Sequence, residues 1–204
     1  MNAVLNSPLP RAVNEQAITA LFTEARTQNG WLPTPVPDAT LRRLYDVVRA
    51  GPTAQNCQPM RLVFLRTHEA KARLIPALST GNVEKTRQAP VTMIVGWDTQ
   101  FFELMPTLWH RPEARDTFAN NPALADSTAL RNATLQGGYL ILAARALGLD
   151  CGPMSGFDAA KVNAEFFGDG RWRANFLCNL GHGDPGLLFG RQRRLDFDEA
   201  CELL

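Results

Sequence analysis

Apolar residues recur every three or four positions in the first part of the chain, which is the spacing of one helical face. This pattern predicts a helix over residues 15–29, with Gly30 as its end. A second helix is predicted to begin at Asp38, as the N-cap, and to end at Gly51 and Pro52. The chain therefore opens with two helices that each bury one face.

Short apolar runs predict strands at three later places. Residues 61–66 (RLVFLR), 90–97 (PVTMIVGW) and 175–180 (NFLCNL) are apolar but too short for core helices. Thr67 follows the first run directly and can cap a further helix. The result is an α+β fold in which helices outnumber strands.

The longest predicted helix opens at Asn121 and Pro122 and stops just before Gly148. Proline is well tolerated there because the first helical position needs no backbone N–H. Gly137 and Gly138 fall inside this helix, where each costs about 1 kcal/mol relative to Ala. We therefore expect another helix to pack closely against that face.

Residues 98–121 are rich in aromatic side chains but poorly periodic. Two interpretations stay open for Phe101, Phe102, Trp109 and Phe118. The segment is either a partly helical flap that closes over a ligand and excludes water, or an apolar segment packed on the core. No repeat or linker divides the chain, so we expect one domain over residues 15–204, preceded by a flexible arm of residues 1–14.

Composition places the chain among ordinary globular proteins, since 45% of its 204 residues are hydrophobic and 20% are charged. Its 21 basic and 20 acidic side chains nearly cancel, which gives no field to favour nucleic acid or a membrane surface. The N-terminal segment has no apolar run of signal-peptide or membrane-span length. These features predict a cytoplasmic protein without nucleic-acid or membrane partners.

The four cysteines are scattered and form no CxxC pair, and the three histidines do not cluster with them. No metal site is expected. Reduced thiols in the core of a cytosolic protein are the better interpretation of Cys57, Cys151, Cys178 and Cys201.

Three short motifs suggest a function but lack the required context. Residues 181–186 (GHGDPG) match a dinucleotide fingerprint, yet too few residues follow for the second strand, so a turn after a strand is expected. Ser155 lacks the glycine two positions earlier that a nucleophile elbow needs, because Pro153 stands there. The basic run 191–194 is too short for nucleic acid, but two or three cations suffice for one phosphate.

Four further segments are weak alone and informative together. They are ARTQNGW at 25–31, GPTAQNCQP at 51–59, GLDCGPMSGFD at 148–158 and RQRRLDFDEAC at 191–201. In this order and spacing they resemble the FMN-dependent nitroreductase family over about residues 15–204. Within it, they are most similar to the malonic semialdehyde reductase branch of uracil breakdown.

The resemblance implies a nitroreductase-like fold, with a central mixed sheet flanked by helices, in a homodimer. The long helix with Gly137 and Gly138 is the candidate for the dimer core. FMN would be the cofactor and NADH or NADPH the reductant of a ping-pong hydride transfer. The implied small-molecule substrate is malonic semialdehyde, reduced to 3-hydroxypropionate. The alternatives are a broad nitro- or quinone-reductase, a flavin-binding sensor without turnover, and an unliganded structural domain.

The resemblance also assigns residues to the phosphate of FMN, which carries roughly −1.5 to −2 charge. They are Arg26, Thr27, Asn29, Arg191 and Arg194. Arg26 and Arg191 would clamp the phosphate bidentately. Asn29 stands where common nitroreductases have a basic residue, so Arg193 or Arg194 is expected to compensate. Alternatively, Arg26 pairs with a neighbouring acid.

A second set is assigned to the flavin ring, and no side chain is expected to be catalytic. It comprises Pro52, Thr53, Ala54, Asn56, Pro153, Met154, Ser155 and Gly156. Asn56 has an amide that matches the donors and acceptors of the flavin edge, and its loop is expected to serve the partner subunit's flavin. Residues 153–156 would pass beneath the ring and offer a backbone N–H. Alternatively, Asn56 only caps a turn and Met154 belongs to the core.

Overall fold

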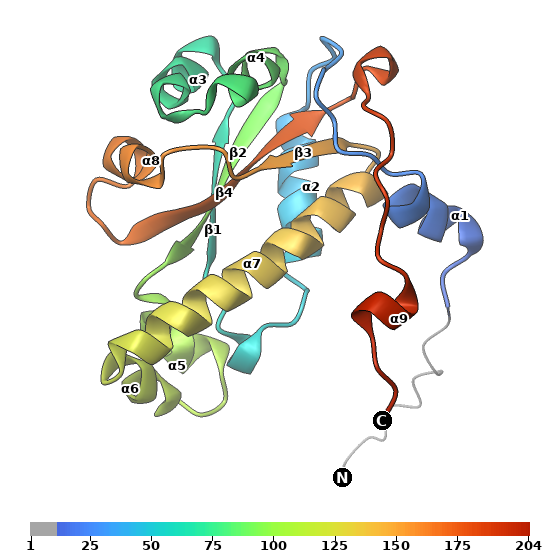
Figure 1. The fold of residues 1–204 in the computed structure, drawn as a ribbon. Helices are drawn as coiled ribbons and strands as arrows, with labels where there is room; N and C mark the ends of the chain where they lie inside the picture. The colour runs from blue at the N-terminus through green and yellow to red at the C-terminus, as the bar shows by residue number, and fades with distance from the viewer. Residues whose placement is uncertain (1–11) are drawn as a thin grey trace.

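A single four-stranded sheet lies at the centre of the computed structural model, which describes residues 12–204 (Figure 1). Its order is β1-β2-β4-β3. The strands are β1 (Met60–Leu65), β2 (Val91–Asp98), β3 (Asp150–Met154) and β4 (Trp172–Gly181). All three pairings are antiparallel, so the α+β class is confirmed while the sheet is antiparallel rather than mixed. Residues 1–11 of the expected N-terminal arm lie outside the described residues.

Five helices of seven residues or more surround the sheet in the described part of the chain. They are α2 (Asp38–Val48), α3 (His68–Leu74), α4 (Thr80–Gln88), α7 (Pro122–Ala146) and α8 (Ala159–Phe166). Shorter helical turns are α1 (Glu15–Ile18), η1 (Thr19–Thr23), η2 (Ala54–Asn56), η3 (Ile75–Ala77), η4 (Phe101–Leu104), α5 (Met105–Leu108), α6 (Ala114–Ala119), η5 (Pro185–Leu187) and α9 (Phe197–Ala200).

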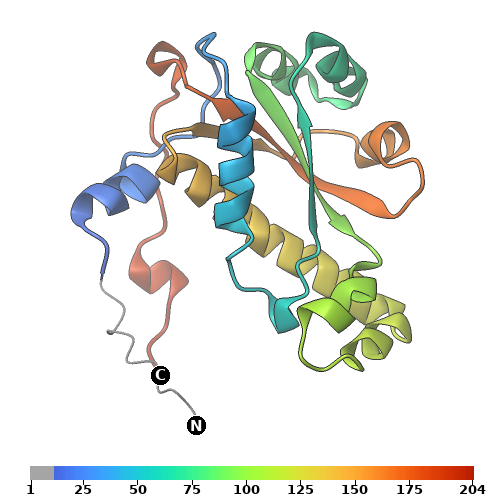
Figure 2. The same cartoon turned by 180° about the vertical axis from the view of Figure 1, so that it is seen from behind.

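Helices cover both faces of the sheet (Figures 1 and 2). On one face, α2 and α7 pack against the sheet, with Leu44, Met93 and Leu140 fully buried. On the other, α3 and α8 enclose Ile94 and Leu177. Met93 and Ile94 point to opposite faces, as neighbours in a strand do, which explains why the middle of β2 is apolar on both faces.

Helix α7 begins and ends as predicted. The Asn121 side chain accepts a hydrogen bond of 3.1 Å from the backbone N–H of Leu124. Gly148 follows the helix with a φ of 76°, a left-handed conformation that favours glycine.

The two glycines inside α7 differ in their surroundings. A Cβ at Gly137 would come within 2.6 Å of the Phe176 ring, so this glycine lets α7 approach strand β4. The expectation of a helix against this face is wrong for Gly137. Gly138 is exposed and meets nothing within 4 Å in the described chain.

The first predicted helix is much shorter than expected. It forms over α1 and the π-helical turn η1, and ends at Thr23 instead of Asn29. The next residues leave the helix because they pair with the sheet edge: Gln28 N–H donates to the Cys151 carbonyl at 2.9 Å. Gly30 is needed for close packing rather than as a helix end, since a Cβ there would lie 2.1 Å from the Leu187 side chain.

The segment 98–121 forms η4, α5 and α6. Phe101 and Phe118 are buried in a small cluster with Ala125 and Ala129 of α7, and their rings contact each other edge to face. These two aromatic residues are therefore core residues, as the second interpretation held.

Two local predictions need correction and one is confirmed. Pro37, not Asp38, occupies the N-cap position of α2. Strand β3 was not predicted, because its glycine and proline are unfavourable in strands; Pro153 is tolerated since β3 lies at the sheet edge. Thr67 caps α3 as predicted, accepting a hydrogen bond of 3.1 Å from the Ala70 N–H.

Cys57, Cys151 and Cys178 are buried as expected, whereas Cys201 is exposed and does not belong to the core. All four thiols are free. Among residues 12–204, no helix combines the length and apolarity needed to cross a membrane.

Candidate functional site

The C-terminal segment runs beside α1 and the end of α7 (Figure 1). A cleft of about 840 Å³ is lined by residues from these parts of the chain. Three parts of the chain form its walls: residues 22–29, the last turn of α7 and residues 189–194. The lining residues are Phe22, Thr23, Ala25, Arg26, Thr27, Asn29, Arg145, Phe189, Gly190, Arg191, Gln192 and Arg194.

The cleft is strongly cationic. Four of its lining residues are arginines, and none is Asp or Glu. Within residues 12–204, none of these arginines forms an ion pair. Such a concentration of uncompensated guanidinium groups favours an anion with several oxygen atoms.

Backbone carbonyls, rather than carboxylates, hold three of these arginines in place. Arg26 donates to the Phe189 carbonyl, and Arg145 donates to the Leu21 carbonyl at 2.7 Å. Arg194 donates to the Gln192 carbonyl at 3.0 Å. A guanidinium has five N–H donors, so each keeps donors for a ligand. The alternative in which Arg26 pairs with a neighbouring acid is therefore not what the described residues show.

The first wall of the cleft is fixed by pairing with the edge of the sheet. Thr27 forms a parallel bridge with Cys151 of β3, and Trp31 forms an antiparallel bridge with Gly183. A Cβ at Gly183 would lie 2.1 Å from the Gln28 side chain. The glycine-rich run at the end of β4 thus leads into a turn, as predicted, and the structure shows that it packs against residues 27–31.

Neighbouring arginines in the C-terminal wall have different environments. Arg193 is not among the cleft residues, because its guanidinium pairs with Glu199 and lies 3.7 Å from Asp196. Both acids belong to the capping box of α9. Of the two residues expected to compensate for Asn29, only Arg194 lines the cleft.

The loop at residues 51–59 is held by polar side chains of α7. The side-chain oxygen of Asn132 accepts from Ala54 N–H at 2.8 Å, and that of Gln136 accepts from Met60 N–H at 3.0 Å. Both amides are buried. The Tyr139 hydroxyl donates to the Pro52 carbonyl at 3.1 Å. These bonds place Pro52, Thr53 and Ala54 against the middle of α7, away from the cleft at its end.

Asn56 sits in a strained part of this loop. Gln55, Asn56 and Gln58 have φ values of 50°, 52° and 40°, which are unfavourable for residues other than glycine. The Asn56 amide donates to the Leu108 carbonyl at 2.9 Å and accepts from Gln58 at 2.8 Å. In one chain the amide therefore ties the loop to the end of α5 and to Gln58. Strain of this kind is often retained at binding sites.

Residues 153–156 leave β3 and pass the start of α4. Met154 is buried in the core beside α8, which supports the core alternative for its side chain. Ser155 is exposed. The Gly156 carbonyl accepts hydrogen bonds from the Asn82 side chain at 2.8 Å and from the Ser79 N–H at 3.0 Å. Asn82 was missed by the sequence analysis, since nothing in its surroundings marks it as a positioning residue.

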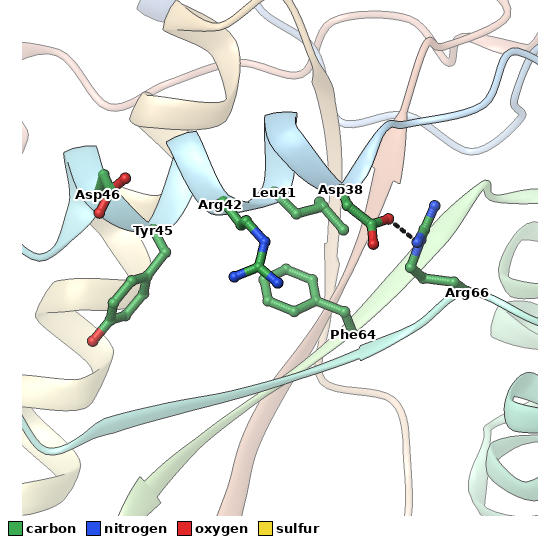
Figure 3. Close-up of a pocket in the computed structure, with 7 residues that line it drawn as sticks. All are labelled: Asp38, Leu41, Arg42, Tyr45, Asp46, Phe64 and Arg66. Atoms are coloured by element: carbon green, nitrogen blue, oxygen red, sulfur yellow. Dashed lines mark hydrogen bonds and ion pairs between the residues drawn. The ribbon is translucent and has the colours of Figure 1, made fainter.

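A second hollow of about 460 Å³ lies between α2 and β1, and its charges are balanced (Figure 3). It contains two arginines, Arg42 and Arg66, and two aspartates, Asp38 and Asp46. Arg66 is already paired with Asp38, as the dashed line in Figure 3 marks. None of the residues predicted to bind a cofactor lines it, so the arginine cleft is the better candidate for an anion.

Comparison with known proteins gives the family. The sequence matches the Nitroreductase family over residues 24–182. The chain belongs to the nitroreductase family. It is 57% identical over 184 residues to a Ralstonia nicotianae protein provisionally named NADH dehydrogenase/NAD(P)H nitroreductase, covering 90% of this chain and 94% of that one. A Cupriavidus pinatubonensis protein of the same provisional name is 55% identical over 191 residues, covering 92% and 97%.

A solved structure supports the nitroreductase-like fold. It is a nitroreductase, provisionally assigned, from Exiguobacterium sibiricum in complex with FMN, and it matches with a TM-score of 0.83 at 17% identity. The match covers 96% of this chain and 99% of the other.

Five of the residues predicted to bind the cofactor lie together in the arginine cleft of this nitroreductase-family chain. Arg26, Thr27, Asn29, Arg191 and Arg194 all line the arginine cleft. The remaining predicted residues, in the 51–59 loop and the 153–156 segment, are not among its lining residues. Arg145 was missed, although a basic residue in the last turn of the longest helix, just before GLDCGPMSGFD, was a usable signal.

The buried thiols near these segments are poor nucleophiles. Burial raises the pKa of Cys57 to about 11. A hydrogen bond with Cys151, together with burial, raises the pKa of Cys178 well above its ordinary value. Both thiols stay protonated at neutral pH. Among residues 12–204, no group of three or more His, Cys, Asp or Glu side chains could hold a metal ion.

Proposed function

We propose that this chain is an FMN-dependent NAD(P)H oxidoreductase and that the arginine cleft binds the FMN phosphate. The cleft itself carries this proposal, because it has four arginines and no acidic lining residue. A phosphate monoester brings roughly −1.5 to −2 charge and three acceptor oxygens, which suit several guanidinium groups. The FMN complex of the Exiguobacterium relative supports the cofactor, and the names of the Ralstonia and Cupriavidus relatives support the reductant.

Within the cleft, Arg26 and Arg191 clamp the phosphate, while Thr27 donates its hydroxyl and Asn29 and Arg194 complete the wall. When bound, FMN supplies the hydride chemistry. The chain contributes position: Asn82 and the Ser79 N–H hold residues 153–156, whose backbone is proposed to address the ring.

The strained 51–59 loop is proposed to contact the flavin of a second copy in a homodimer. Its bonds to the middle of α7 keep Pro52, Thr53, Ala54 and Asn56 apart from the arginine cleft of their own chain. Because these bonds fix the loop, its surface has one defined shape that a second copy can contact. Strain at Gln55, Asn56 and Gln58 supports a role in binding rather than in folding alone.

The central test is flavin selectivity. Purified protein should be yellow, and Arg26→Ala should weaken FMN binding by about 2 kcal/mol, or roughly thirtyfold, with little change for phosphate-free riboflavin. Arg193→Ala is the matched control, because Arg193 pairs with α9 acids and should leave both affinities unchanged. Dissociation constants follow from the quenching of flavin fluorescence. A protein that binds neither flavin, or binds both equally, would refute the cleft assignment.

We further propose malonic semialdehyde as the substrate, because the segments at 25–31 and 148–158 resemble that branch of the family. Its kcat/KM should exceed that of nitroaromatics at least about tenfold, or 1.4 kcal/mol of differential transition-state binding. Steady-state assays of both substrate classes with NADH and with NADPH test this. A preference for nitroaromatics or quinones would select the broad-specificity alternative, and flavin that stays oxidised with either reductant would select the sensor.

A further inference from the structure

Arg145 lies in the last turn of α7, where the helix meets the arginine cleft. It is half-buried and comes from a different wall than Arg26 and Arg191. Its Nη1 donates to the Leu21 carbonyl at 2.7 Å, and this hydrogen bond holds the guanidinium against η1.

The position of Arg145 is costly without a bound anion. No acidic side chain of residues 12–204 lies within ion-pair distance of it, and a partly desolvated cation without a counter-ion is unfavourable. The partial negative charge at the end of α7 and the Leu21 carbonyl offset part of this cost. Most of its five N–H donors nonetheless remain without a partner in the described residues.

Asn29 also lines this cleft, but its side chain is neutral. The wall formed by residues 22–29 therefore contributes a single cation, Arg26. Arg145 adds a second cation to the same cleft from the last turn of α7.

We propose that Arg145 is a further ligand of the phosphate group in this cleft, and that it makes the chain select phosphorylated over phosphate-free flavin. The inference rests on the proposed function, since it takes FMN as the ligand. A purely structural Arg145, acting only through the Leu21 carbonyl, would support both flavins alike.

The test compares Arg145→Gln with Arg145→Lys in the full-length protein after removal of flavin. Gln keeps an N–H donor and loses the charge, whereas Lys keeps the charge and loses the planar guanidinium that can donate two parallel hydrogen bonds. FMN and riboflavin are titrated separately, with flavin fluorescence as the readout. Arg73→Gln is the matched control, because Arg73 is an exposed arginine of α3, on the other face of the sheet, and does not line the cleft.

For Arg145→Gln we expect at least a tenfold loss of FMN affinity and less than a twofold change for riboflavin. Arg145→Lys should lose less FMN affinity, and Arg73→Gln should change neither affinity. Adding Asn29→Lys to Arg145→Gln should recover at least threefold of the FMN affinity, since it restores a cation to the same cleft. Equal losses for both flavins, or an unchanged FMN affinity, would overturn the proposal.

The outcomes also separate this inference from the proposed function. If the unsubstituted protein does not prefer FMN over riboflavin, the phosphate assignment of the whole cleft fails. If it does prefer FMN but Arg145→Gln preserves that preference, only the role of Arg145 fails. Thermal unfolding of each variant by circular dichroism identifies any loss of folding. If Arg145→Gln does not fold, Arg145→Lys provides the test. Its preference for FMN over riboflavin must then be at least threefold lower than that of the unsubstituted protein. A smaller change would overturn the proposal.

Discussion

Arg193 and Arg194 are neighbours in the sequence, yet only Arg194 lines the cleft. Arg193 turns instead to the acids that cap α9. The sequence shows both arginines as equivalent candidates, because the capping geometry that diverts one of them exists only in the folded chain. Arg26 and Arg191 could be predicted because their segments resemble the family.

Cys57 is a buried thiol whose ionisation opposes folding. Burial raises its pKa from 9.0 to about 11, so above pH 9 the unfolded chain loses this proton before the folded chain does. The stability gained from the protonated thiol is complete below pH 9 and is lost as the pH rises toward 11. Between pH 9 and pH 11 the free energy of unfolding should fall less in Cys57→Ala than in the unsubstituted protein. The difference between the two falls should be at most about 2.7 kcal/mol.

Urea unfolding at pH 8 and pH 10.5 measures this difference. Cys201→Ala is the control, because Cys201 is exposed. The Ala substitution at Cys57 lowers stability at both pH values by removing buried atoms, so only the change between them is informative. An identical pH dependence in Cys57→Ala and the unsubstituted protein would contradict the assignment.

Elements with a strong local pattern could be predicted to within a few residues. Helix α7 has a proline at its start and a glycine after its end, and strands β1 and β2 consist mostly of apolar residues. The helix predicted over 15–29 was too long because residues 27–31 gain more from pairing with β3 and the turn after β4. Such pairing is a long-range interaction, and helical periodicity carries no information about it.

Helical glycines should differ according to the side chain that a Cβ would meet. Gly137→Ala should destabilise the protein by about 1–3 kcal/mol, since the added methyl would lie 2.6 Å from the Phe176 ring. Gly81→Ala in α4 meets nothing within 4 Å and should stabilise by up to about 1 kcal/mol. Urea denaturation of both variants checks the pair. Stabilisation by Gly137→Ala would show that α7 can move away from β4.

At the scale of the whole molecule, one chain gathers the residues proposed for the phosphate into one cleft, whereas those proposed for the flavin ring do not line it. The family resemblance could predict which segments take part, but not that the 51–59 loop lies against the middle of α7. That placement depends on amides of α7 that are 70 or more residues away in sequence. Under the proposed function, the flavin contacts of the loop are therefore expected with a second copy.

The exposed face of α7 is proposed as the dimer contact. Leu130 and Leu135 are 42% and 45% exposed there, and Gly138 has open space beside it. Sedimentation should show a dimer at micromolar concentration, and Leu135→Glu should shift it toward monomer while lowering FMN retention. Ala160→Glu adds the same charge on α8, behind the sheet, and should do neither. A monomer that keeps its flavin would rule out the shared site.

Helix α7 holds the 51–59 loop through Asn132 and the cleft through Arg145, thirteen residues further along. At 1.5 Å per residue these two attachments are about 20 Å apart, and the helix sets both their distance and their relative direction. One inserted or deleted residue between them would rotate Arg145 by about 100° away from the cleft. Length changes in natural relatives should therefore accumulate in the loops on either side, while this stretch of α7 keeps a constant number of residues.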